Sequence, residues 1–468
     1  MDPQFFSPLC DLSRQMGLIS QDQLNIIYDH LAIFELLDND LKSAQNYGDW
    51  ILSNMDICWR GRLIETLFFY LEANACQRDP DNAVKALRVL YHVTTYCTEI
   101  KMQHISMFSN LFVVLKVVLE LTQVQDIIVD CTLDLVSNFL FSSWMIRDAI
   151  ESSGLLSAML NKLDWPPGTD VVKQNSLIAK IGLLLYQFLR HKTPGPAITA
   201  LEKIAKTLAA LLSVNQDLTI LMPLLKLTRL VAEHQSATER VMIKTGLFAN
   251  TASLVQSPLY EVKYEAIFIL ANTCQLYGRV KRHNLHRLPP STLRYIHHLF
   301  RHRCMKIRIM ALHLLTGITD NRAIDPSLMC GIMPMVIRCA SELELEVEVR
   351  VAAGWTLASL TLHLNVRGMA YFVHSGGVHA MCYLLKTVQE LPIQLIRNIL
   401  TAFIKIWESY RYLASHLVNI LRECGIMDGL QQYMDSPNHA VRTLATLLKA
   451  HKGYDICWVE VLAMLNID

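Results

Sequence analysis

The feature that most constrains this chain is a long amphipathic segment that returns about every 44 residues. Apolar residues in each copy recur three and four positions apart, which is typical of a helix that buries one face. A repeat of this length and kind predicts tandem copies of one helical unit. The nine copies span residues 83–94, 128–140, 172–189, 221–231, 262–276, 307–318, 349–362, 395–407 and 441–450.

A shorter pattern, a small residue followed by Gly and an apolar run, accompanies the long segments. Glycine lets one helix end in the left-handed conformation and the next begin at a sharp angle. We therefore expect a helix junction at each of five sites, Ser153-Gly154, Thr245-Gly246, Cys330-Gly331, Gly376-Gly377 and Cys424-Gly425. The proline-rich residues 194–196 and 289–290 precede apolar segments where the spacing predicts two further junctions.

The length of the repeat discriminates between helical repeat families. Ankyrin and tetratricopeptide units of ~33 and ~34 residues are too short, whereas armadillo and HEAT units of ~40–47 residues fit. We expect an all-α, right-handed α-solenoid of about nine to ten armadillo-type repeats over residues 61–468, after an N-terminal helical cap at residues 1–60. Each unit of such an array buries its apolar face only against its neighbours.

Composition excludes several classes of protein. With 18 Gly and 15 Pro in 468 residues, an all-β fold is excluded because short strands need more turn residues. The formal net charge of +1 identifies no partner. Twelve Cys without a Cys-x-x-Cys pair favour reduced thiols. No apolar stretch reaches the ~20 residues of a membrane helix, and residues 1–10 carry no Lys or Arg of a leader, so we expect no membrane partner and a location in nucleus and cytoplasm.

Two of the long segments carry a distinctive pattern. Residues 262–272 read V-K-Y-E-A-I-F-I-L-A-N, and residues 350–360 read R-V-A-A-G-W-T-L-A-S-L. Both resemble the third helix of an armadillo repeat in the importin-alpha family, whose pattern is E-A-x-W-x-L-x-N. Residues 424–436, C-G-I-M-D-G-L-Q-Q-Y-M-D-S, are similar to the second helix of that family.

The resemblance implies a binding groove. In importin-alpha proteins, Asn amides of the concave surface hold the backbone of an extended peptide, and Trp rings sandwich its lysine stems. The resemblance therefore implies a non-enzymatic adaptor, linked to nuclear import, whose protein partner presents an extended segment. Carried over position by position, it implies groove residues Asn138, Phe268, Asn272, Trp355 and Ser359.

The chain departs from the family at its N-terminal side. The Trp positions of the first four units hold Arg88, Asp134, Ile178 and Leu225. A simple basic signal is therefore expected to bind poorly there. Residues 1–50 contain eight acidic residues and two basic ones, so the basic segment that recruits importin-beta in the family is not expected. An armadillo scaffold for one dedicated partner, without a transport role, is the alternative interpretation.

Residues 279–308 form a basic stretch without any acidic residue. Such a density of cations makes a positive local field, which favours docking of an acidic protein segment or of nucleic-acid phosphates. A solvated surface with incidental charge is the alternative, and the scarcity of aromatic residues argues against a base-stacking site. The cations are Arg279, Lys281, Arg282, Arg287, Arg294, Arg301, Arg303, Lys306 and Arg308.

A row of acidic residues stands just ahead of Trp355. Two interpretations fit this row: an acidic lip that attracts a basic peptide toward Trp355, or an internal partner for the basic stretch one repeat earlier. Its members are Glu342, Glu344, Glu346 and Glu348, which alternate with apolar residues.

Motifs of catalysis and metal binding are absent from the sequence. It contains no Gly-rich phosphate loop, no G-x-S-x-G, no H-E-x-x-H and no paired Asp motif. His298 and His302 stand four apart, but no Cys, Asp or Glu close in sequence completes a four-ligand site. We therefore expect no enzyme activity, no metal and no cofactor.

Overall fold

The computed structural model describes the chain in segments, and the predicted cap at residues 1–60 lies outside them. Every regular element in the described residues is a helix, which confirms the all-α prediction. The chain divides into two compact units, Met1–Ala237 and Thr238–Asp468, called the N-terminal and C-terminal units below. The described residues are 67, 70–96, 105–121, 124–141, 143–164, 170–191, 193–214, 217–234, 238–280, 290–320, 326–388, 390–409 and 414–450.

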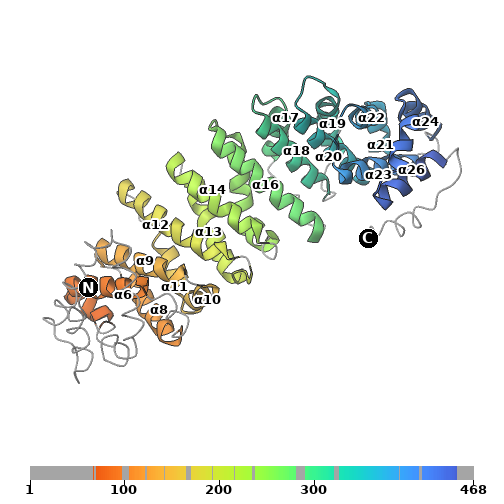
Figure 1. Ribbon diagram of the computed structural model, residues 1–468. Helices are drawn as coiled ribbons and strands as arrows, with labels where there is room; N and C mark the ends of the chain where they lie inside the picture. The colour runs from red at the N-terminus through yellow and green to blue at the C-terminus, as the bar shows by residue number, and fades with distance from the viewer. Residues whose placement is uncertain are drawn as a thin grey trace. The chain divides into compact units, whose positions relative to one another are not determined.

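The long segments of the sequence all lie in helices, called third helices below. Each unit stacks its third helices side by side in chain order, as Figure 1 shows from orange to yellow-green in one unit and from green to blue in the other. Those of the N-terminal unit are α6 (Pro80–Tyr96), α9 (Asp126–Leu140), α12 (Val171–Arg190) and α14 (Leu218–Glu233). Those of the C-terminal unit are α16 (Tyr260–Val280), α18 (Met305–Asp320), α20 (Val347–His363), α23 (Ile393–Ser409) and α26 (His439–Ala450).

The remaining helices form a second layer against the third helices. In the N-terminal unit they are α5 (Ala73–Arg78), α8 (Ile105–Glu120), α10 (Trp144–Ser152), α11 (Leu155–Asn161) and α13 (Ile198–Val214). In the C-terminal unit they are η2 (Thr238–Ile243), α15 (Leu247–Ser253), η3 (Leu254–Gln256), α17 (Pro290–Leu299), α19 (Pro326–Ser341), α21 (Val366–His374), α22 (Gly377–Thr387), α24 (Ala414–Glu423) and α25 (Ile426–Met434). A short helix, a turn, a second helix and a long third helix make an armadillo-like repeat.

Four of the five predicted glycine junctions have the expected backbone. Gly154, Gly246, Gly376 and Gly425 have φ angles between 63° and 89°, the left-handed region that disfavours a Cβ. The fifth prediction is wrong, because Gly331 lies inside the continuous helix α19. In the Gly376-Gly377 pair the first Gly makes the turn, and the second already belongs to α22.

A buried arginine holds the Pro194-Gly195-Pro196 turn. This turn lies between α12 and α13, where other repeats have a first helix. Arg147 of α10 is 1% exposed and donates hydrogen bonds to the backbone oxygens of His191, Pro194 and Gly195. Its charge is balanced by Asp148, with 2.8 Å between the nitrogen and oxygen atoms. One guanidinium thus satisfies three carbonyl groups that a continuous helix would have paired.

Local capping fixes where several third helices begin. The side chain of Asp170 accepts a hydrogen bond from the amide of Val172 at the start of α12, and Asp217 accepts one from Thr219 at the start of α14, both at 2.9 Å.

Within the described residues, no helix combines the length and the apolar character that crossing a bilayer requires.

Candidate protein-binding surface

An aromatic stripe runs along the third helix α16. Tyr260, Tyr264 and Phe268 are spaced four residues apart, with ring centroids 6.2 Å apart in the first pair and 6.3 Å in the second. Asn272 follows on the next turn, and hydrogen bonds among the described residues leave its amide unused. Only Phe268 and Asn272 came from the family pattern. The four-residue spacing of the two tyrosines is the signal that predicts their place on the same face.

The stripe continues across the neighbouring third helices. Phe268 on α16, His313 on α18 and Trp355 on α20 occupy equivalent positions, each is half-exposed, and the three helices pack against one another in order. Burial lowers the pKa of His313, so its imidazole is neutral at pH 7 and adds a third uncharged ring. We call these three residues the aromatic row.

Charged side chains stand two helical turns before the members of the aromatic row. Glu261, Lys306 and Glu348 each precede the ring of their own helix by seven residues, and all three are exposed. Residues seven apart share a helix face, so each ring has a charge on its own face. The signs alternate from helix to helix, negative, positive and negative.

Two of the expected groove residues are used inside the fold. The amide of Asn138 donates to the Tyr91 carbonyl at 3.2 Å and to the Thr94 hydroxyl at 2.9 Å, both on the preceding third helix. Ser359 is 7% exposed, and its hydroxyl lies 2.7 Å from that of Thr319 on the preceding third helix. These side chains join adjacent third helices, and an extended peptide would find neither of them available.

The row of acidic residues ahead of Trp355 divides into two pairs. Glu342 pairs with Arg338 one turn earlier at 3.0 Å, and Glu346 pairs with Arg308 of the preceding repeat. The hydrogen bond from Arg338 lowers the pKa of Glu342. Glu344 and Glu348 are exposed and have no ion pair among the described residues. Glu346 therefore has the role of an internal partner, while Glu344 and Glu348 keep their charges available.

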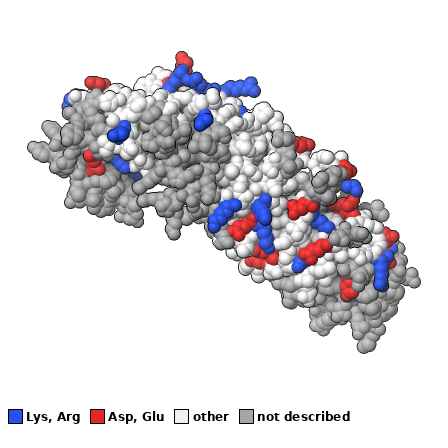
Figure 2. Space-filling view, turned by 180° about the vertical axis from the view of Figure 1, so that it is seen from behind, with Lys and Arg blue, Asp and Glu red and all other residues white. Residues whose placement is uncertain are grey.

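The basic stretch is described only in part. The side chains of Arg279, Lys281, Arg282 and Arg287 lie outside the described residues. Arg294, Arg301, Arg303 and Lys306 are exposed, and Arg308 is held by Glu346. On the face seen in Figure 2, the described basic and acidic side chains are interspersed.

No cluster of described residues offers the three His, Cys, Asp or Glu side chains that a metal ion needs.

The third helices of the N-terminal unit present a different surface. Ile178 and Leu225, at the aromatic-row position, are 4% and 0% exposed and belong to the core. Asp134 at the same position forms an ion pair with Lys180 of the next third helix at 2.9 Å. The first of the four described residues at this position in the N-terminal unit is Arg88, so none of the four is aromatic.

Comparisons with known proteins agree with the fold and identify no function. No protein-family model and no curated protein matches the sequence. An engineered protein solved by crystallography is 16% identical, with a TM-score of 0.61 over 97% of this chain and 100% of its own. A designed armadillo repeat protein is also 16% identical, with a TM-score of 0.43 over 53% of this chain and 98% of its own.

Proposed function

We propose that this chain is a non-enzymatic binding protein that holds an extended segment of a partner protein on the third helices of its C-terminal unit. The aromatic row of Phe268, His313 and Trp355 is the observation that supports this proposal most directly. Half-exposed rings on packed helices receive a partner's side chains without first ordering a loop. Scaffolds of armadillo-like repeats are suited to protein binding for the same reason.

The dimensions fit a peptide of modest length. Packed helices lie ~9–10 Å apart, so Phe268 and Trp355 are about 20 Å apart on the first and third helices. An extended chain rises ~3.3 Å per residue and spans that distance with about six residues. The unused amide of Asn272 can pair with the backbone of such a segment one turn beyond Phe268.

Nuclear import is the narrower form of this proposal. It is supported by the importin-alpha-like pattern of residues 262–272 and 350–360, and it would have the protein meet its partner in nucleus and cytoplasm. The described third helices of the N-terminal unit carry no aromatic ring at the position that grips a basic signal, and recruitment of importin-beta is not part of the proposal. A scaffold for one dedicated partner without a transport role uses the same surface.

A selected peptide provides the test. A random peptide library is selected on the immobilised full chain, and the affinity of the selected peptide is measured for wild type, Trp355→Ala and Asn272→Ala. We expect Trp355→Ala to cost about 2 kcal/mol, about thirtyfold in affinity, if the ring is a desolvated contact. Trp144→Ala is the matched control, because Trp144 is 40% exposed on α10 in the other unit.

The melting temperature separates binding from folding. Retained melting temperature with lost affinity in Trp355→Ala supports the proposal, and equal losses of both would show that Trp355 is a packing residue. Equal affinity of the Trp355 and Trp144 variants contradicts the proposal. Binding of an oligonucleotide that weakens steeply with salt, and that is lost in Arg301→Ala/Arg303→Ala, would favour a nucleic-acid function of the basic stretch instead.

A further inference from the structure

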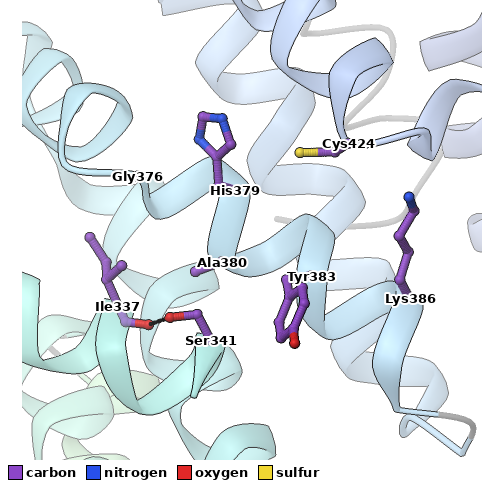
Figure 3. Close-up of a pocket in the computed structure, with 8 residues that line it drawn as sticks. All are labelled: Ile337, Ser341, Gly376, His379, Ala380, Tyr383, Lys386 and Cys424. Atoms are coloured by element: carbon purple, nitrogen blue, oxygen red, sulfur yellow. Dashed lines mark hydrogen bonds between the residues drawn. The ribbon is translucent and has the colours of Figure 1, made fainter. Parts of the chain in front are cut away.

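A pocket of about 380 Å³ is lined by one cysteine, Cys424, and by no residue of a third helix. Its walls come from α19, α22 and the junction between α24 and α25, as Figure 3 shows. Cys424 stands at this junction, just before the left-handed Gly425, and lines the pocket with its thiol. Cys382 is fully buried in α22, and its thiol is close enough to that of Cys424 for each to shift the pKa of the other.

We propose that Cys424 and Cys382 form a redox-active thiol pair, in which Cys424 reacts with a hydroperoxide from the pocket and Cys382 then closes a disulfide. The pair, the pocket and a neighbouring lysine carry this proposal together. It is independent of what the third helices bind.

A cation stands beside the reactive thiol. Lys386 follows Cys382 by one turn on α22, and its ammonium group is so close to the α24–α25 junction that a Cβ on Gly425 would lie 2.9 Å from it. The hydrogen bond from Cys382 and the charge of Lys386 lower the pKa of Cys424 to about 7, against the opposing effects of burial and of Glu423. A large fraction of Cys424 is therefore thiolate at neutral pH, and the thiolate is the nucleophilic form.

The second thiol is set up differently. Its hydrogen bond to Cys424 and its burial both raise the pKa of Cys382, so it stays protonated and does not meet the oxidant first. One partly exposed thiolate next to one buried thiol is the arrangement of a reacting and a resolving cysteine. The remaining groups that line this end of the pocket, His379 on α22 and Tyr383 one turn later, bring no carboxylate that would oppose the thiolate.

The other described cysteines lack a lowered pKa, a second thiol beside them, or both. Burial raises the pKa of both Cys76 and Cys339 to about 11 and raises that of Cys274 further, so these thiols are inert. Burial raises the pKa of Cys304, but its hydrogen bond with Tyr260 and those from the backbone of Lys306 and Ile307 outweigh burial and lower the pKa. Cys304 contacts the hydroxyl of Tyr260 and not a second thiol, which makes it a matched control.

The chemistry balances with the hydroperoxide as the oxidant. The Cys424 thiolate attacks the terminal oxygen, the O–O bond breaks, and the alkoxide leaves and takes up a proton to become an alcohol. Cys424 is then a sulfenic acid. The Cys382 thiol loses its proton and attacks the Cys424 sulfur, the S–O bond breaks, and hydroxide leaves with that proton as water. Two thiols have supplied two electrons, and one disulfide, one alcohol and one water result.

The test uses the full chain treated with hydrogen peroxide under native conditions, followed by alkylation of free thiols and peptide mapping. We expect a peptide pair linked through Cys382 and Cys424 in the wild type and in Cys304→Ser, and no such pair in Cys424→Ser. In Cys382→Ser we expect the sulfenic acid on Cys424 to persist and to be trapped by dimedone. Far-UV circular dichroism of each variant checks that it is folded.

A second measurement does not depend on the disulfide. Alkylation of Cys424 by iodoacetamide should have its midpoint near pH 7 in the wild type, and Lys386→Gln should slow it several-fold at pH 7 because the stabilising charge is gone. A Cys424 that alkylates no faster than Cys339 overturns the proposal. The proposal is also overturned if two results occur together after peroxide treatment. The wild type would contain no Cys382–Cys424 disulfide, and Cys424 of Cys382→Ser would carry no dimedone.

Discussion

The hydroxyl groups of Thr319 and Ser359 lie 2.7 Å apart across the interface of α18 and α20. The same interface holds a second hydroxyl pair one turn earlier, Thr316 and Thr356, at 2.9 Å. Lys405 of α23 likewise donates to the backbone oxygen of Leu362 on α20. Polar side chains near the family's Asn position thus connect α20 to α18 and α23 to α20.

Replacing Ser359 with Ala tests this internal role. We expect the free energy of unfolding to fall by about 1 kcal/mol, the usual net value of one buried hydrogen bond. The loss stays moderate because the Thr319 hydroxyl keeps the Thr316 carbonyl at 2.7 Å as an acceptor. Urea denaturation measures the change, and the affinity for the selected peptide should stay at the wild-type value.

Thr446→Ala on α26 is the control for Ser359→Ala. Its hydroxyl also bonds to its own helix, at 2.8 Å from the Arg442 oxygen, but the residue is exposed, so the change should stay within about 0.5 kcal/mol. If Ser359→Ala kept its stability and lost the peptide, Ser359 would be a groove residue after all.

The architecture could be predicted from the sequence because it depends on a periodic apolar pattern. All nine long segments lie in third helices, since helical spacing of apolar residues leaves each segment one way to bury its face. The predicted roles of Asn138 and Ser359 depend instead on rotations of a few tens of degrees about a helix axis. The family pattern gives their positions along the chain, but not whether the preceding helix offers a partner such as Thr94 or Thr319.

The glycine junctions show the same division. A small residue followed by Gly occurs at Gly331 as well as at Gly425, yet α19 continues through Gly331. A helix interior and a left-handed turn both accept Gly, so the dipeptide cannot distinguish them. What decides is whether the neighbouring helices leave room for one long helix or require two short ones.

Substitutions at three glycines should therefore change the free energy of unfolding in different directions and for different physical reasons. Gly376→Ala meets no atom within 4 Å, and its cost of about 1 kcal/mol comes from the φ angle of 89° alone. Gly377→Val should cost more, because a Cβ there lies 2.4 Å from the buried Phe372 ring. Gly331→Ala should stabilise by about 0.5–1 kcal/mol, since it sits in a helix with open space around it. Thermal unfolding of the three variants compares them, and a destabilised Gly331→Ala would contradict the assignment.

The half-buried carboxyl of Glu408 in α23 should make the free energy of unfolding fall as pH rises. Burial raises the pKa of Glu408 from 4.5 to about 7, and one carboxyl oxygen lacks a hydrogen-bond partner. A folded-state pKa above the unfolded value means that the folded protein holds the proton more tightly. Its stabilising effect is complete below pH 4.5 and is lost between pH 4.5 and about 7.

Glu408→Gln should remove this dependence, because the amide has no proton to lose. We expect the variant to unfold at a higher urea concentration than the wild type at pH 8 and to lose that advantage at pH 5. The exposed Glu423→Gln serves as the control and should show no such crossing. Parallel pH profiles for Glu408→Gln and the wild type would place the Glu408 carboxylate in contact with water.

The alternating charges beside the aromatic row predict the charge pattern of the partner segment. Neighbouring third helices lie ~9–10 Å apart, which is about three residues of an extended chain. A segment with Lys at its first and seventh positions and Glu at its fourth would therefore face Glu261, Lys306 and Glu348 with opposite charges. The pattern reads the same in both chain directions, so the prediction does not depend on which way the segment runs.

Fluorescence anisotropy with two synthetic peptides measures the effect. The peptide with the Lys, Glu, Lys pattern should bind about tenfold more tightly than its charge-reversed counterpart, since exposed pairs contribute up to ~1 kcal/mol each and reversed pairs repel. Glu348→Gln should reduce this preference, and raised salt should reduce it further. Glu344→Gln is the matched control, because Glu344 is exposed but precedes α20 and shares no helix face with Trp355. Equal binding of the two peptides, or equal effects of the two glutamate variants, would mean that the row recognises its partner through the rings alone.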